Sequence, residues 1–86
     1  MEVIHESARQ RFVVTTDGLE SVLEYRWNGR AAVNFSHTFV PPQLRGRGIA
    51  ERLARTGIAW ARAQGLQMQA SCWYVGRILE RRRAPD

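Results

Sequence analysis

The chain has 86 residues and a net charge of +5, with 44% apolar residues, three tryptophans and 13 basic residues that are all arginine. A chain of this size can bury one modest core, so we expect a single domain over residues 1–86, and its basic charge favours anionic partners such as nucleotides, nucleic acids or acidic proteins. We expect neither a membrane span nor a secretory leader, because no apolar run approaches ~20 residues and no signal-peptide pattern is present. The single cysteine excludes an internal disulfide framework and favours a cytoplasmic location.

The first third of the chain alternates between strand-like and turn-like segments. Short strands are predicted over residues 3–5 and 12–16, and Asp17-Gly18 is a turn dipeptide that ends the second of them. Residues 19–27 place apolar side chains at alternate positions, as a half-buried strand does. Asn28-Gly29 is a strong hairpin signal and connects this strand to the next one.

A fourth strand is predicted over residues 30–40. Because successive side chains of a strand point to opposite faces, we expect one face to carry Ala31, Val33, Phe35, His37 and Phe39. We therefore expect His37 to be partly buried beside its apolar neighbours. Proline cannot donate to a strand ladder, so Pro41-Pro42 ends the strand.

The second half of the chain predicts a helix, a strand and a second helix. Apolar residues recur at helical spacing over residues 48–64, and Gly65 suits the position after a helix end. A strand over 66–72 and a short helix over 74–82 follow. A strand–helix–strand unit is nearly always a right-handed crossover, so the last strand should be parallel to the one before the helix. The predicted fold class is α/β of the α+β kind: a mixed sheet with about four antiparallel strands, a helix, a parallel strand and a C-terminal helix.

Between the fourth strand and the helix lies the hexapeptide Arg45-Gly46-Arg47-Gly48-Ile49-Ala50. A glycine-rich turn at a helix N-terminus offers backbone N–H groups and partial positive charge to an anion. The pattern predicts a site for a phosphorylated ligand. The alternative is that Gly46 and Gly48 only form a turn and that the two arginines are solvated.

The segment around this turn resembles the GNAT superfamily of acyl-CoA-dependent N-acetyltransferases. The spacing Gln43-x-x-Gly46-x-Gly48 fits that superfamily's pyrophosphate-loop pattern, Gln/Arg-x-x-Gly-x-Gly/Ala. The short chain, the His37-Thr38-Phe39-Val40 motif and the later Cys72-Trp73-Tyr74-Val75 are similar to a minimal subfamily of small, stand-alone GNAT-like domains.

The resemblance implies that acetyl-CoA binds in a cleft between the fourth and the last strand. The pantetheine arm would pair with strand backbone, as an added strand does, and the diphosphate would lie on the N–H groups of the turn. The residues that the resemblance assigns to acetyl-CoA are Phe39, Val40, Pro41, Arg45, Gly46, Arg47, Gly48, Ile49 and Ala50. We predict no metal site.

Two residues are candidates for catalysis. Cys72 ends the strand beside the cleft, so it is either a nucleophile that takes the acetyl group, helped by the following helix N-terminus, or a packed structural thiol. His37 is either a general base or a structural histidine. Tyr74 is assigned to the core rather than to protonation of the leaving CoA thiolate. Phe39 and Ile78 stand where small relatives often carry an acidic and an aromatic residue, so we expect slow turnover.

These features predict an acetyl-CoA-binding protein that transfers acetyl to an amine, on a protein or peptide, by direct attack on the thioester. A non-catalytic acyl-CoA-binding protein is the first alternative. The second is a nucleic-acid-binding module that uses arginines on phosphates and tryptophans for stacking. Trp60 lies on the apolar face of the predicted helix, which speaks against that module, and we expect the run Arg81-Arg82-Arg83 to be a solvated terminus.

Overall fold

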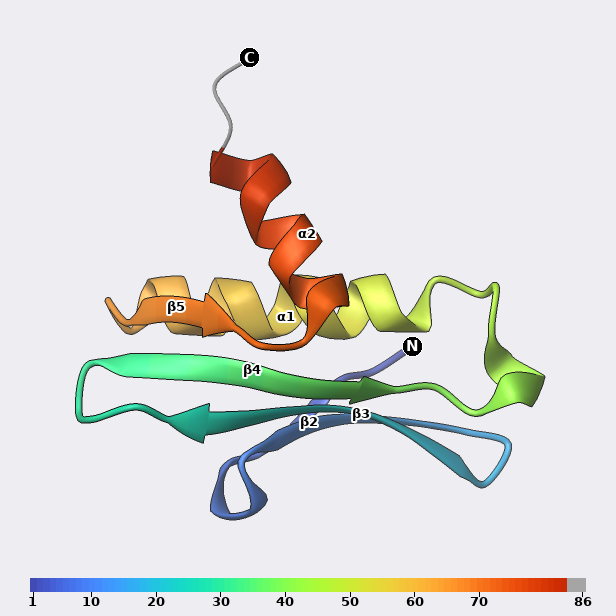
Figure 1. Ribbon diagram of the computed structural model, residues 1–86. Coiled ribbons are helices and arrows are strands. Elements are labelled where there is room, and N and C mark those ends of the chain that lie inside the picture. Colours follow the sequence, from blue (N-terminus) through green and yellow to red (C-terminus); the bar gives the residue numbers. More distant parts are fainter. Residues whose placement is uncertain (84–86) are drawn as a thin grey trace.

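The computed structural model describes residues 1–83 and the side chains up to Arg81, so most of the arginine run at residues 81–83 lies outside the described side chains. The elements in chain order are the strands and helices β1 (Ile4–Glu6), β2 (Arg11–Thr16), β3 (Leu19–Trp27), β4 (Ala32–Phe39), α1 (Ile49–Ala63), β5 (Gln67–Ala70) and α2 (Trp73–Arg83), with 3-10 turns at Ser7–Arg9 and Pro42–Leu44. Figure 1 shows the strands as one layer, with α1 lying against it and α2 rising from the end of β5.

The sheet has the strand order β1-β2-β3-β4-β5. Strands β1 to β4 pair as consecutive antiparallel neighbours, whereas β5 returns through α1 and pairs in parallel with β4. This arrangement confirms the predicted fold class and the predicted parallel pairing of the last strand with the strand before the helix. The Leu66 N–H donates a 2.9 Å hydrogen bond back to the Ala61 carbonyl, which ends α1. Gly65 therefore lies just after the helix end, as the sequence predicts.

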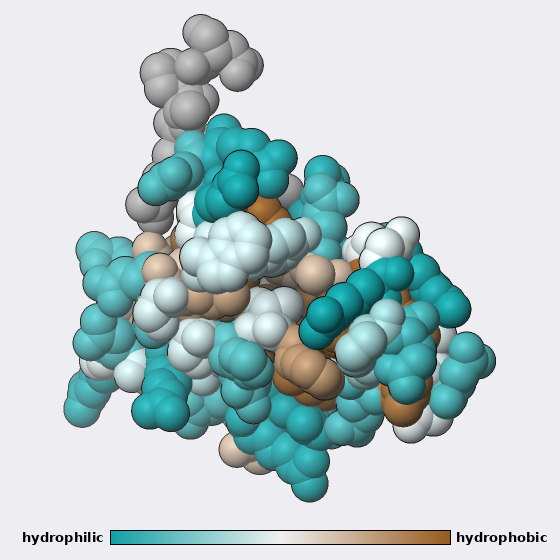
Figure 2. All heavy atoms as spheres, turned by 45° about the vertical axis from the view of Figure 1, so that its right-hand side comes forward, coloured by the Kyte–Doolittle hydropathy of each residue, from teal (hydrophilic) through white to brown (hydrophobic). Residues whose placement is uncertain are grey.

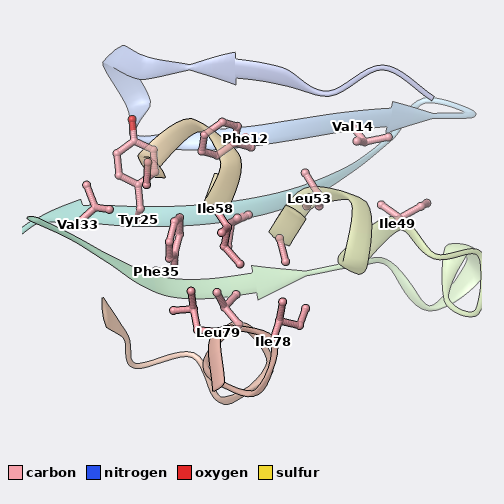
Figure 3. Packing of buried hydrophobic residues seen from close by; sticks show 14 of the residues in the cluster. Phe12, Val14, Tyr25, Val33, Phe35, Ile49, Leu53, Ile58, Ile78 and Leu79 are labelled. Carbon is pink, nitrogen blue, oxygen red and sulfur yellow. The ribbon is translucent and has the colours of Figure 1, made fainter. Parts of the chain in front are cut away.

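The core lies between the sheet and both helices. Phe12, Leu23 and Phe35 are fully buried on the sheet side, and Leu53 and Ile58 of α1 pack on them. Ile78 and Leu79 of α2 close the same cluster beside β4 (Figure 3). Ile78 is therefore a core residue in this chain.

Helix α1 approaches the sheet most closely at Gly57. A Cβ added there would lie 2.8 Å from Leu23 Cδ2 and 3.1 Å from Phe35 Cε1. Real Cβ atoms do not come so close to a neighbour, so the glycine allows the helix to lie directly on the two central strands.

An aromatic cluster fixes the N-terminal strand to the far end of α1. The ring of His5 stacks on Phe12 with a centroid distance of 4.2 Å and meets the Trp60 ring edge-on at 4.8 Å. His5 Nε2 and the Tyr25 hydroxyl form a 2.7 Å hydrogen bond, and burial lowers the pKa of His5. Trp60 is half-buried and packs against the core, which agrees with its predicted place on the apolar face of the helix.

A β-bulge changes which side chains of β4 face the core. Phe35 pairs with Tyr25 and His37 pairs with Glu24, so Ser36 is an extra residue with no opposite number in the register of β3. Val33 and Phe35 are fully buried, but beyond the bulge the alternation is reversed. The predicted single face from Ala31 to Phe39 is therefore wrong after Phe35.

The reversal moves His37 to the solvent. Its side chain is exposed, next to the exposed carboxylate of Glu24, and Phe39 on the same outer face is 43% exposed. The expectation of a partly buried His37 is thus wrong. Thr38 instead turns to the side of the buried Leu23, where the helices lie.

Candidate functional site

Strands β4 and β5 separate halfway along β4. The ladder joins Ala32–Phe35 to β5, and its last contact is a 3.1 Å bond from the Cys72 N–H to the Phe35 carbonyl. From Ser36 onwards, the edge of β4 has no strand partner on this side within residues 1–83. An unpaired strand edge of this kind can accept an extended ligand as an added strand.

This separation opens a cavity of about 360 Å³, which we call the β4–β5 cleft. Its lining residues are Thr38, Phe39, Val40, Arg45, Ala50, Cys72, Trp73 and Tyr74. Figure 2, which brings this end of the molecule forward, shows hydrophobic surface in the hollow below α2, surrounded by hydrophilic side chains. Trp73 at the start of α2 is 70% exposed, and the Arg77 guanidinium lies 6.0 Å from its ring centroid.

The glycine-rich turn forms a second cavity of about 190 Å³, which we call the loop pocket. Its lining residues are Val40, Leu44, Arg45, Gly46, Gly48, Ile49, Ala50, Glu51 and Tyr74. Gly46 and Gly48 have φ values of +84° and +79°, a conformation that L side chains rarely adopt, and a Cβ on either would meet no atom within 4 Å. The sequence therefore needs glycine at both positions, and the space in front of them is open.

The start of α1 supplies the donors of the loop pocket. Gly48 is the N-cap residue, and no side chain caps the helix. The N–H groups of the first turn lack intrahelical acceptors, so here they are available to an anion, and the helix dipole adds to the attraction. The Ile49 side chain is buried, so this residue can contribute to the pocket only through its backbone.

Arg45 connects the two cavities. Its Nε donates a 3.0 Å hydrogen bond to the Val40 carbonyl, which holds the turn against the end of β4. Arg45 lines both the cleft and the loop pocket. Tyr74 also lines both cavities while packing against the core, and burial raises its pKa.

Cys72 lies half-buried in the β4–β5 cleft with its Sγ 3.5 Å from Thr38 Oγ1. Burial alone would raise the pKa of this thiol, but hydrogen bonds from the Thr38 side chain and from the backbone at Val75 and Tyr74 outweigh it, so the pKa lies below its ordinary value. A thiol in this position has more thiolate character than an ordinary buried cysteine.

The structure brings together most of the residues predicted for the site. Phe39, Val40, Cys72 and the turn residues other than Arg47 line these two cavities, whereas Pro41 is buried outside them and His37 lies on the outer face of the sheet. Thr38, which contacts Cys72, was not predicted. Position 36 is a serine rather than a glycine or proline, so no residue type marks the bulge. The sequence therefore carries no local sign that Thr38 turns towards the helices and His37 towards solvent.

The tryptophans do not form one stacking surface. Trp27 and Trp60 belong to the aromatic cluster, with ring centroids 5.9 Å apart, whereas Trp73 borders the cleft. Within residues 1–83, no helix is long and apolar enough to cross a membrane.

Residues 11–85 match the family described as GCN5-related N-acetyl-transferase. Over 88 aligned residues, the chain is 32% identical to Protein NATD1 of Gallus gallus and of Homo sapiens, covering all of this chain and 80% and 78% of those proteins. Protein NATD1 of Danio rerio is 30% identical, with 100% of this chain and 80% of that protein covered.

Two solved structures are similar to this one. The solution structure of a GCN5-like protein from Staphylococcus aureus superimposes with a TM-score of 0.73 at 26% identity, covering 94% of this chain and 79% of that one. The aminoglycoside N-acetyltransferase AAC(6')-Iy, solved in complex with CoA, gives a TM-score of 0.53 at 20% identity, covering 88% and 66%, which supports the fold alone. The chain belongs to the GCN5-related N-acetyltransferase family, which confirms the resemblance seen in its sequence and its acetyl-CoA cosubstrate.

Proposed function

We propose that this protein transfers the acetyl group of acetyl-CoA to an amine on a protein or peptide. The observation that carries the proposal is that the β4–β5 cleft and the loop pocket are continuous. They share four lining residues, Val40, Arg45, Ala50 and Tyr74. An elongated ligand with an anionic middle can therefore extend from one into the other.

Acetyl-CoA has the shape and charge that this path requires. Its diphosphate would lie in the loop pocket, on the N–H groups at the start of α1 and beside Arg45. Its pantetheine arm would pair with the free edge of β4 after Ser36, which brings the thioester to Thr38 and Cys72. CoA is bound in the aminoglycoside acetyltransferase that shares this fold.

The chemistry that we propose is direct attack. The nitrogen of a neutral amine forms a bond to the thioester carbonyl carbon, while backbone N–H groups of β4 polarise the carbonyl oxygen. The carbon–sulfur bond then breaks, and the proton lost by the nitrogen ends on the CoA sulfur. Tyr74, which the sequence assigns to the core alone, also lines this cleft, and its raised pKa keeps it protonated; it can therefore give its own proton to the sulfur and be reprotonated by the proton that the nitrogen loses.

The lowered pKa of Cys72 supports a second route, in which the acetyl group passes first to Sγ and then to the amine. His37 can act as a base only for an amine that approaches from the outer face of the sheet, where Glu24 and Phe39 also lie. We also propose a cytoplasmic location, because Cys72 carries a free thiol and reducing compartments preserve thiols.

Acetyl transfer can be tested with purified protein, acetyl-CoA and peptides that carry either a free N-terminus or an internal lysine. We expect acetylated peptide by mass spectrometry and an equal amount of released CoA. Calorimetric binding of acetyl-CoA without product on any amine would contradict transfer and leave an acyl-CoA-binding protein. No binding at all would contradict the whole proposal.

Cys72→Ala separates the two routes. Direct transfer predicts that the variant keeps most of its turnover and its acetyl-CoA affinity. The two-step route predicts a thioester adduct of about 42 Da on the wild-type protein before any amine is added, as covalent catalysis requires. That adduct, together with loss of turnover in Cys72→Ala at unchanged affinity, would show that direct transfer is wrong.

A further inference from the structure

A third cavity, of about 330 Å³, lies beside the first two turns of α1. We call it the arginine pocket, and its lining residues are Met1, Arg47, Gly48, Glu51, Arg52 and Arg55. The spacing of Gly48, Glu51, Arg52 and Arg55 places them on one face of the helix. That face is turned away from the buried Leu53 and Ala54, so it is open to a ligand.

The charges in this pocket are unbalanced. It contains three guanidinium groups and one carboxylate, a difference of two positive charges. Glu51 is 3.5 Å from Arg55, whereas neither Arg47 nor Arg52 has an ion-pair partner among the described residues. Arginines grouped around a cavity without carboxylates to match them favour a phosphate, which their planar donors bind well.

The arginine pocket continues the path formed by the other two cavities. It shares Gly48 and Glu51 with the loop pocket, just as the loop pocket shares Arg45 and Ala50 with the cleft. The order along the path is therefore cleft, loop pocket and arginine pocket. Acetyl-CoA carries its groups in the same order: thioester and pantetheine, then diphosphate, then the ribose with its 3′-phosphate.

We propose that the arginine pocket binds the 3′-phosphate of CoA, with Arg52 and Arg47 as its principal contacts. This inference rests on the proposed placement of the pantetheine arm and the diphosphate in the first two cavities. A phosphate monoester carries between one and two negative charges near neutral pH, which matches the excess charge of the pocket. The protein thereby distinguishes CoA from dephospho-CoA, which is the same molecule without this phosphate.

The test compares two ligands on four proteins by isothermal titration calorimetry at one fixed salt concentration. The ligands are CoA and dephospho-CoA, and the proteins are the wild type, Arg52→Gln, Arg47→Gln and Arg62→Gln. Arg62 is the matched control, because it is an exposed arginine in the last turn of the same helix and lines none of the three cavities. Arg47→Gln is a second variant at the pocket.

We expect wild-type protein to bind CoA about tenfold more tightly than dephospho-CoA, as the loss of one charge-assisted contact predicts. Arg52→Gln should weaken CoA binding by a similar factor and leave dephospho-CoA binding unchanged, and Arg62→Gln should change neither. Equal wild-type affinities for both ligands, or equal losses on both in Arg52→Gln and Arg47→Gln, would overturn the inference while leaving the proposed function intact. Failure of both ligands to bind the wild type would overturn the inference and the proposed placement together.

Discussion

The requirement for glycine at position 48 can be tested by adding a single methyl group. In Gly48→Ala, the new Cβ would meet no atom within 4 Å, so it creates no clash. Its cost comes from the φ of +79°, because an L residue in the left-handed conformation loses about 1–2 kcal/mol. The melting temperature of a domain of this size falls by roughly 4–8 °C for each kcal/mol.

A second variant controls for this loss of stability. Gly29, in the hairpin between β3 and β4, has a φ of +82° and is equally free of neighbours within 4 Å. Gly29→Ala should therefore destabilise the protein as much as Gly48→Ala does. Gly29 lines none of the three cavities, so its substitution should leave ligand binding unchanged.

Acetyl-CoA binding should separate the two variants. Gly48 lines the loop pocket, so we expect a methyl group at this position to displace the diphosphate from the first-turn N–H groups. Loss of one hydrogen bond to a charged group costs about 1.5–3 kcal/mol, which corresponds to a roughly 10- to 100-fold weaker Kd. Calorimetry below the melting transition measures this directly. Equal affinities in Gly48→Ala and Gly29→Ala would refute the assignment of the loop pocket to the diphosphate.

Three further predictions concern other parts of the molecule. Thr38→Val removes a hydrogen bond that lowers the pKa of Cys72, so alkylation of the thiol by iodoacetamide near neutral pH should become slower, and an unchanged rate would contradict the role of Thr38. His5 has a lowered pKa in the folded protein, so the unfolded chain binds more protons, and the free energy of unfolding should fall as the pH drops through 6.5 and below. Denaturant titrations at a series of pH values measure this dependence, and His5→Phe should flatten it. Gly57→Ala should lower the free energy of unfolding by about 1 kcal/mol, since overpacking of about 1–3 kcal/mol against Leu23 exceeds a gain of about 1 kcal/mol in helix propensity; a more stable variant in the same titration would show that the two side chains can move aside.

The sequence predicts the elements that depend on local patterns. Helical spacing of apolar residues locates α1, and the hairpin dipeptide at Asn28-Gly29 locates the turn into β4. The spacing of Gly46 and Gly48 before a helix predicts the loop pocket, because both glycines are required by backbone conformations that the turn itself imposes.

Features that depend on pairing between distant segments are not predictable in this way. The bulge at Ser36 is defined by the register of β4 against β3, and no residue in β4 encodes it locally. The contact between Thr38 and Cys72 spans 34 positions in sequence and depends on that bulge. Likewise, Arg52 has the sequence features of an ordinary solvated arginine, and only the fold shows that it adjoins Arg47 at the end of a continuous path.

The single extra residue at Ser36 also separates two kinds of evolutionary constraint within one strand. Before it, Val33 and Phe35 must remain apolar, since they form part of the interior under the helices. After it, position 37 faces solvent, and substitutions there leave the interior untouched. If acceptors approach from this outer face, descendants of this protein can change their acceptor through mutations at position 37 without losing stability or acetyl-CoA binding. The range of acceptors can then diverge in this fold with little loss of stability, while the cosubstrate stays the same.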